Sequence, residues 1–491
     1  MSLRSLCPYG LYVLTVLCLV ACAEKPHDAE RAEMLPPIYP DYEGVTVPVN
    51  IAPLNFLLRD DCEVVYAEAK GTAGIITIAA RGNEIEFGPK QWHRFLEMHQ
   101  DKSFRITVSA KKDGQWIEYD PISINVSGDS IDPYLTYRLI EPDYEIFSRL
   151  QIKERCVENF TERTLCDYNM VGNRCMNCHT YGAGRPDRSF LYVRGEGGGM
   201  ILNDAGQLRK LGLKTDNMVS GSVYAQFSPS GRWLVFSANV IIPGFHANPS
   251  KRLEVFDTKS DVYVADLANN TIVANPILAD SLTLETFPTF SPDGKSLYYC
   301  AAQWKPKASA IDSLQYSLCR VDFNESTGRV GKEIDTIVAA RLGEKSSVCH
   351  PRVSPDGRYL LYTVADYGTF PIWHRESDQQ MIDLTTGEIN EMARANSDQS
   401  DTYHSWSSNG RWIVFASKRD DGLYGKPYFC HVSETGEVSK AFVLPQKHPT
   451  LYETNLKSFN APELGRGQVL FDAADVAAAM ELPAETFSRE D

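Results

Sequence analysis

The sequence lacks an excess of positive charge. It carries 49 Lys and Arg against 64 Asp and Glu, which gives a formal net charge of −15 at pH 7. Nucleic acids and anionic membrane surfaces attract basic proteins, so neither is expected as a partner. The fingerprints of nucleophile-elbow hydrolases, zinc proteases, P-loop enzymes and dinucleotide-binding folds are also missing. We therefore favour electron transfer or binding over hydrolysis, which stays a weaker alternative.

The apolar run after Arg4 is too short for a stable membrane span but has the length of a signal peptide. It ends in Leu19-Val20-Ala21-Cys22, which resembles the bacterial lipobox. The resemblance implies removal of residues 1–21, lipidation of Cys22 and anchoring in the bacterial cell envelope, most simply at the outer membrane. Residues 22–45 would then form a tether. An ordinary signal peptide with a coincidental cysteine is the alternative.

Residues 46–128 contain short alternating segments separated by turn residues, which predicts a β-sandwich-like domain. Residues 129–184 include a stretch with helical spacing and are predicted to form a short helical segment. Nine cysteines lie beyond Cys22, and the sequence does not determine whether any of them pair. The closest candidates in sequence are Cys156 with Cys166 and Cys300 with Cys319.

A repeat dominates residues 185–449. "FSPSGRWLVFSA" from Phe227 recurs as "FSPDGKSLYYCA" from Phe290, "VSPDGRYLLYTV" from Val353 and "WSSNGRWIVFAS" from Trp406. Each unit has a tight turn followed by an alternating strand, with further strands behind it, as in one blade of a propeller. The repeat resembles that of TolB-like β-propellers. We predict a mainly β protein with a propeller of six blades, which residues 450–491 help to close.

The stretch "NRCMNCHTY" places Cys175, Cys178 and His179 in the spacing C-x-x-C-H. In a helix these positions share one face, as covalent attachment of a c-type haem requires. Two thiols bind the vinyl groups and the imidazole binds the iron. Zinc would need a fourth ligand, and a redox dithiol would need a different fold around it. These two and a structural disulfide remain the alternatives to one covalent haem c.

The chain resembles a family of Bacteroidetes-type lipoproteins that join one c-type haem motif to a TolB-like propeller. The likeness rests on "NRCMNCHTY", "ETFPTFSPDG", "RVSPDGRYLLYT" and "SKRDDGLYGKPYF". It implies haem binding, with His179 as the proximal iron ligand. His246, which matches a family histidine, is the first candidate for the distal ligand, and Met200 is the second.

The repeat register adds a second group of candidate residues. Tyr224, Phe287, His350 and Tyr403 each precede a repeat by three positions, so they are predicted to recur around one mouth of the propeller channel, beside His404. They could bind a ligand or simply close the channel. The sequence as a whole favours a membrane-anchored monohaem cytochrome whose propeller binds a redox or envelope partner. A TolB-like envelope scaffold with a structural or vestigial haem site is the alternative.

Overall fold

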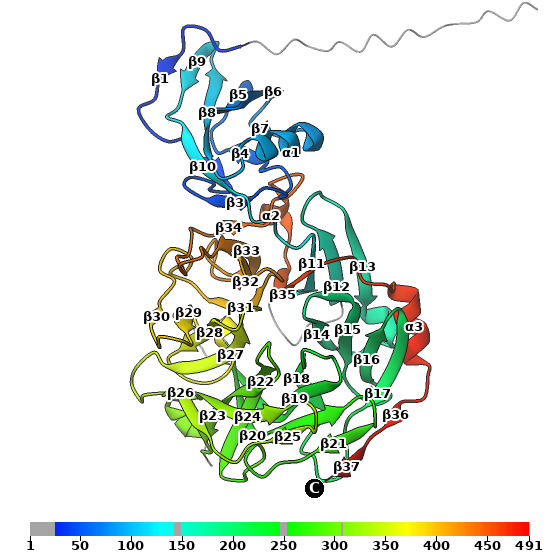
Figure 1. Cartoon of the computed structure of the whole chain (residues 1–491). Coiled ribbons are helices and arrows are strands. Elements are labelled where there is room, and N and C mark those ends of the chain that lie inside the picture. Colours follow the sequence, from blue (N-terminus) through cyan, green and yellow to red (C-terminus); the bar gives the residue numbers. More distant parts are fainter. Residues whose placement is uncertain (1–24, 142–148, 246–252, 306–307, 491) are drawn as a thin grey trace, which may run out of the picture.

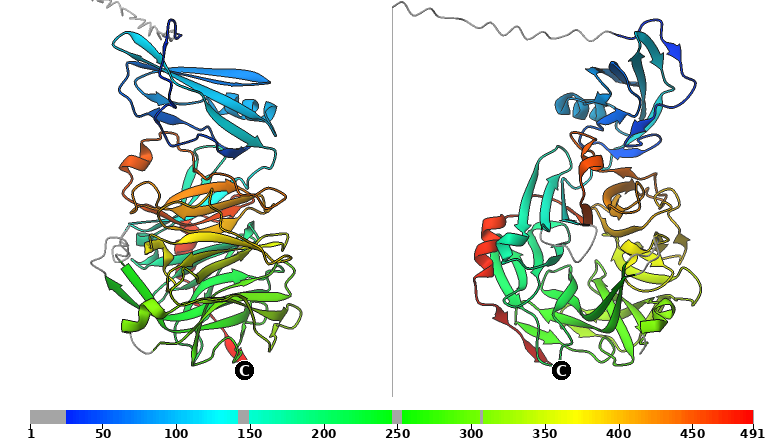
Figure 2. Two further views of the ribbon diagram at one scale, coloured as in Figure 1. Left: turned by 90° about the vertical axis from the view of Figure 1, so that its left-hand side faces the viewer. Right: turned by 180° about the vertical axis from the view of Figure 1, so that it is seen from behind.

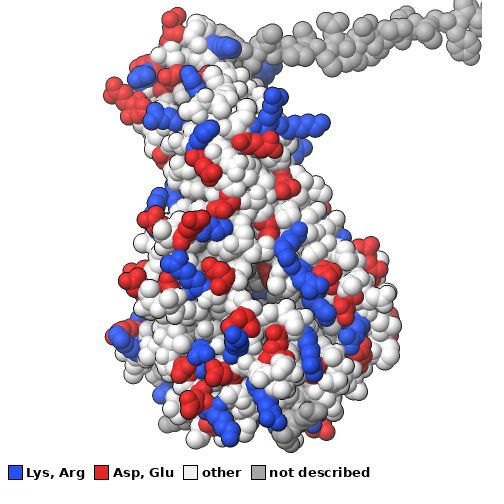
Figure 3. All heavy atoms as spheres, viewed as in Figure 1, with Lys and Arg blue, Asp and Glu red and all other residues white. Residues whose placement is uncertain are grey.

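The computed structural model describes residues 25–141, 149–245, 253–305 and 308–490, and within these ranges the protein is mainly β. The predicted signal peptide and the predicted lipidation site Cys22 lie outside the described residues. No helix in the described ranges is both long and apolar enough to cross a membrane. On the face shown in Figure 3, acidic and basic side chains are interspersed.

The N-terminal domain is built from two sheets and a helix (Figure 1). The larger sheet contains β1 (Glu30–Arg31), β3 (Thr46–Pro48), β5 (Val64–Gly71), β6 (Gly74–Arg81), β8 (Ser103–Lys112), β9 (Gln115–Glu118) and β10 (Ile122–Ser127). The smaller sheet contains β2 (Ile38–Tyr39), β4 (Phe56–Leu58) and β7 (Glu84–Ile85). Helix α1 (Pro89–Met98) starts at a proline and buries Trp92, Phe95 and Leu96, the face that i, i+3, i+4 spacing creates.

The tether prediction for residues 22–45 is wrong from β1 onward. Strand β1 pairs with β9, and β2 pairs with β4. Tyr42 and Val45 are fully buried. The segment looked like a tether because polar residues prevail, but its few apolar side chains complete the core of the domain.

Residues 129–184 do not form the predicted helical segment. Their described part contains β11 (Tyr134–Ile140), β12 (Gln151–Cys156), β13 (Glu162–Asp167), the single turn η1 (Tyr168–Val171) and β14 (Met176–Gly182). Strand β11 pairs with β35 (Ser458–Gly465), more than 300 residues later. Residues 149–163, the described part of the stretch with helical spacing, contain β12, which pairs with β11 on one side and β13 on the other. This pairing outweighs local helical propensity.

Six mainly antiparallel sheets follow one another around a ring in the described part of the chain (Figures 1 and 2). The first joins β11, β12 and β13 to β35. The second sheet contains β14, β15 (Arg185–Val193), β16 (Gly199–Asp204) and β17 (Gln207–Gly212), and the third contains β18 (Ser222–Phe227), β19 (Trp233–Phe245), β20 (Leu253–Asp266) and β21 (Thr271–Val273). The fourth contains β22 (Thr283–Phe290), β23 (Ser296–Gln303), β24 (Ser317–Asn324), β25 (Arg329–Val330) and β26 (Asp335–Val338). The fifth contains β27 (Ser347–Val353), β28 (Tyr359–Ala365), β29 (Asp378–Asp383) and β30 (Ile389–Asn390), and the sixth contains β31 (Asp401–Trp406), β32 (Trp412–Ser417), β33 (Lys426–His431) and β34 (Phe442–Val443).

The C-terminal residues hold the ring together. Strand β35 contacts β31 and β33 of the last sheet while it pairs with β11 of the first. After α2 (Leu451–Thr454), β35 and α3 (Ala473–Met480), the chain adds β36 (Glu485–Thr486) to β17 and β37 (Ser488–Glu490) to β21, both in parallel. The sheet that contains β11 and β35 therefore combines strands from the beginning and the end of the ring.

The four repeats share one turn geometry. In each, the glycine N–H donates to the carbonyl of the serine three residues earlier, at 2.8 to 3.0 Å; the glycines are Gly231, Gly294, Gly357 and Gly410. All four have φ between +68° and +78°, a conformation that glycine adopts without strain. The glycine at the fourth position of each turn is therefore a requirement of the backbone, whereas the second position is proline in three turns and Ser408 in the last.

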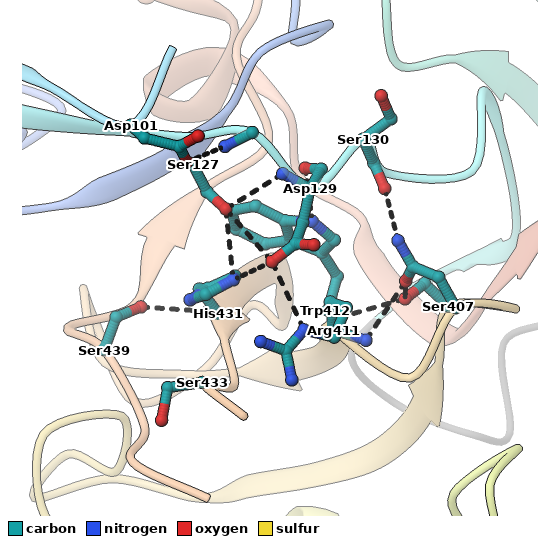
Figure 4. A network of polar contacts seen from close by, with 12 residues as sticks. Asp101, Ser127, Asp129, Ser130, Ser407, Arg411, Trp412, His431, Ser433 and Ser439 are labelled. Atoms are coloured by element: carbon teal, nitrogen blue, oxygen red, sulfur yellow. Dashed lines mark hydrogen bonds and ion pairs between the residues drawn. The ribbon is translucent and has the colours of Figure 1, made fainter. Parts of the chain in front are cut away.

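The N-terminal domain is fixed to the last sheet of the ring. One continuous core contains Phe56 and Trp92 of the domain together with Trp412 and Phe442 of the ring. At its edge, the Asp129 carboxylate contacts His431 Nε2 at 2.8 Å and Arg411 Nε at 3.2 Å, and Trp412 Nε1 donates to the Asp129 carbonyl at 3.0 Å (Figure 4). The shared core and this network give the domain a defined orientation on the ring.

Candidate functional site

The C-x-x-C-H motif lies at the start of β14, in a strand, and the predicted helical face does not exist. The pairing of β14 with β15 shifts register between Met176 and Cys178. Met176 packs in one hydrophobic core, whereas Cys178 packs against the neighbouring one. In an undisturbed strand, Cys175 and Cys178 would face opposite ways, and the register shift between Met176 and Cys178 interrupts that alternation.

Cys175, Cys178 and His179 nevertheless meet at one cavity of about 330 Å³. Tyr224, His350 and Tyr403 line the same cavity. The C-x-x-C-H motif and three residues of the predicted aromatic group, which sequence reasoning treated as separate sites, thus line one site, whereas Phe287 of that group does not line it. The ring of sheets brings them together, because β14, β18, β27 and β31 are each the first strand of their sheet.

The aromatic wall is a chain of ring contacts. Ring centroids are 4.4 Å apart for Tyr224 and Phe287, 4.2 Å for Phe287 and His350, and 4.7 Å for His350 and Tyr403. All four residues have φ between +50° and +54° and lie at a register shift between the first two strands of their sheet. Such a backbone is strained for large side chains, and strain of this kind concentrates at binding sites.

Histidine 404 lies behind this wall. Its Nε2 is 2.7 Å from the His350 carbonyl oxygen, and its Nδ1 is 3.4 Å from Thr363 Oγ1. Burial, with a smaller effect of Arg352, lowers its pKa to about 3. His404 therefore positions the backbone of His350, and it is not among the side chains that line the cavity.

Three arginines line the cavity. They are Arg138, Arg194 and Arg352, and no Asp or Glu is among the described residues that line it. Burial raises the pKa of the Cys175 thiol, and Arg194 and Arg138 oppose this effect. Arginine recognises carboxylates through paired hydrogen bonds, so a ligand with carboxylate groups suits this wall. Sequence reasoning missed the three arginines because nothing in their local sequence distinguishes them from surface arginines.

The chemistry of the motif residues fits a c-type haem. Cys175 and Cys178 are free thiols, so they form no disulfide with each other or with another described cysteine. Both ring nitrogens of His179 are buried and have no hydrogen-bond partner among the described residues. Burial and Arg138 lower its pKa to about 4, and the nearby backbone of Thr136 and Ala461 opposes them without reaching hydrogen-bond geometry. Two available thiols, an unpartnered imidazole and three cations for two propionates match the needs of the group.

The two candidates for a distal ligand have different positions. Met200, a residue of β16, is 1% exposed, packs in a hydrophobic core and does not line the cavity. His246 lies outside the described residues. Residues Ile241 of β19 and Val255 of β20, on either side of it in the sequence, line the cavity.

A second cavity of about 360 Å³ shares Gln226 and Arg352 with the first. Glu463 of β35 lines it and accepts hydrogen bonds from Thr180 Oγ1 at 2.7 Å and from the Tyr181 N–H at 2.9 Å. Burial raises the pKa of Glu463 to about 7, although these bonds and Arg352 favour the carboxylate. Glu463 thus connects β35 to β14 directly after the C-x-x-C-H motif.

The comparisons with known proteins give little beyond this geometry. No family model matches the sequence, and no curated protein matches it significantly. Among solved structures, an oligogalacturonate lyase in complex with manganese is 14% identical over 63% of this chain and 73% of its own, with a TM-score of 0.36. Prolyl oligopeptidase B from Galerina marginata is 12% identical over 64% and 45%, with a TM-score of 0.35. An exo-1,5-alpha-L-arabinanase from a bovine ruminal metagenomic library is 10% identical over 54% and 95%, with a TM-score of 0.30. These similarities are too weak to assign an activity.

Proposed function

We propose that the protein is a monohaem cytochrome c-like protein of the bacterial cell envelope, anchored by a lipid on Cys22. One haem would occupy the cavity, attached through Cys175 and Cys178, with His179 as the proximal ligand. When bound, the haem would supply a reversible one-electron couple, suited to electron transfer or redox sensing. The partner would be another envelope protein.

We also propose that the ring is a six-bladed, TolB-like propeller. The six sheets and the four matching turns support this. So does β35, a C-terminal strand that pairs with β11 of the first sheet. In a propeller the first strand of each blade lines the central channel. This explains why β14, β18, β27 and β31 supply the cavity walls.

One observation carries the haem proposal: both thiols and the imidazole of the motif line a single cavity, and the described residues around it include three arginines and no carboxylate. The arginines would bind propionates, and the aromatic wall would pack against the porphyrin. The buried walls would limit solvent access to the iron and so affect its potential.

The test is a pyridine haemochrome spectrum of the full-length chain, matured by cells that carry the c-type attachment machinery. We expect a covalent haem that survives denaturation and acid-acetone extraction. The variant with Cys175→Ser and Cys178→Ser should lose it. Cys62→Ser is the matched control, because Cys62 is a half-buried free thiol in the N-terminal domain. Absence of haem from the parent chain, or equal haem in the double variant, would refute covalent attachment.

A further inference from the structure

A histidine and two glutamates from different parts of the chain meet where the N-terminal domain contacts the ring. Glu84 and Glu86 belong to β7 and the residue after it, and His448 lies just before α2. The Nδ1 atom of His448 is 2.9 Å from Glu86 Oε1 and 3.4 Å from Glu84 Oε1. One ligand atom from each residue lies within 4.8 Å of the others.

The local backbone builds this arrangement. Side chains alternate along a strand, so fully buried Ile85 directs both neighbouring glutamates to the opposite side. Buried Asn55 then links the two parts of the chain: its Oδ1 accepts from the Phe87 N–H at 2.9 Å, and its Nδ2 donates to the Lys447 carbonyl at 2.8 Å. The residues adjacent to Glu86 and His448 are therefore held by one rigid amide.

Hydrogen bonding alone leaves this cluster incomplete. A single proton on His448 Nδ1 can be donated along one direction, yet two carboxylates approach that atom. The Oε1 atom of Glu84 is buried and has no hydrogen-bond partner among the described residues. A cation between the three atoms would satisfy all of them at once.

We propose that Glu84, Glu86 and His448 form a zinc site that fastens the N-terminal domain to the ring. Ligand atoms about 2.0 Å from a tetrahedral zinc are about 3.3 Å apart, close to the two distances from Nδ1. A carboxylate–carboxylate–imidazole set suits zinc and disfavours magnesium and calcium, which prefer oxygen ligands alone. Water would complete the coordination, because all three side chains are partly exposed, at 31%, 44% and 54%.

Zinc titration of the full-length chain, stripped of metal and followed by calorimetry, tests the site. The measurement is repeated in the Cys175→Ser and Cys178→Ser variant, so that the haem-motif thiols do not contribute. We expect one equivalent of zinc to bind in both, with an affinity at least about tenfold lower after His448→Gln. Glu453→Gln is the control, because Glu453 pairs with Arg59 at 3.3 Å and is not part of the cluster.

A second readout separates binding from folding. Zinc should raise the melting temperature of the parent chain and leave that of the folded His448→Gln variant unchanged. Three outcomes would overturn the proposal: zinc binding that disappears with the two cysteines, equal zinc affinity after His448→Gln, or displacement of zinc by equimolar calcium or magnesium. None of these outcomes depends on whether the chain carries haem.

Discussion

The carboxyl group of Glu463 should make the stability of the protein fall as pH rises. Its pKa is raised from 4.5 to about 7 by burial at the contact between β35 and β14. The folded state therefore holds a proton that the unfolded chain releases between these two pH values. Each pH unit in this window corresponds to about 1.4 kcal/mol, so ionised Glu463 costs the folded state about 3 kcal/mol. The cost is absent below pH 4.5 and complete above pH 7.

Glu463→Gln should remove this dependence. A neutral amide oxygen can still accept from Thr180 Oγ1 and the Tyr181 N–H, which donate to Glu463 in the parent. The variant should match the parent near pH 4.5 and become more stable by about 2–3 kcal/mol near pH 7.5. Urea unfolding at a series of pH values measures the difference, and Glu437→Gln, at a surface position, is the control. Parallel pH profiles for parent and variant would show that the carboxyl is solvated or ionised in the folded protein and would refute the argument.

Two further predictions concern the repeats. Gly357 has φ +78° with open space around its Cα, so Gly357→Ala should destabilise the protein by about 1 kcal/mol through backbone strain alone. Gly244→Ala, equally unobstructed but without a positive φ, should stay within about 0.5 kcal/mol of the parent in a urea unfolding assay; equal effects would contradict the strain argument. Trp412 is fully buried where the two domains meet, so Trp412→Ala should cost about 3–5 kcal/mol. Trp412→Phe, which loses mainly the Nε1 bond to Asp129, should cost about 1–2 kcal/mol, and thermal melting that fails to separate the two variants would show that the core there repacks.

Much of the ring could be predicted from the sequence because its signals are local. The turns at Gly231, Gly294, Gly357 and Gly410 need a positive φ, and the residues after them alternate as strands do. The same periodicity correctly indicated that Tyr224, Phe287, His350 and Tyr403 occupy equivalent positions. Their shared φ near +50° and their contacts follow from that equivalence.

The errors concern segments whose conformation depends on distant partners. Residues 142–163 have helical spacing, yet β12 within them is a strand because it pairs with β11 and β13, and β11 in turn pairs with the distant β35. Likewise, the N-terminal residues around Tyr42 are buried in a core made by residues distant in the sequence, so their local sequence does not predict their burial. Short-range propensities differ by less than about 1 kcal/mol per residue, so pairing and burial readily outweigh them.

The sequence by itself determined the repeat, the turn geometry and the functional groups of the motif, which are the thiols of Cys175 and Cys178 and the imidazole of His179. Only the tertiary structure decided that those groups share a cavity with the aromatic wall and with Arg138, Arg194 and Arg352. The reason is physical: residue types and short spacings specify local backbone and functional groups. The distance between β14 and β31 depends on how the intervening sheets close into a ring, a property of the whole chain.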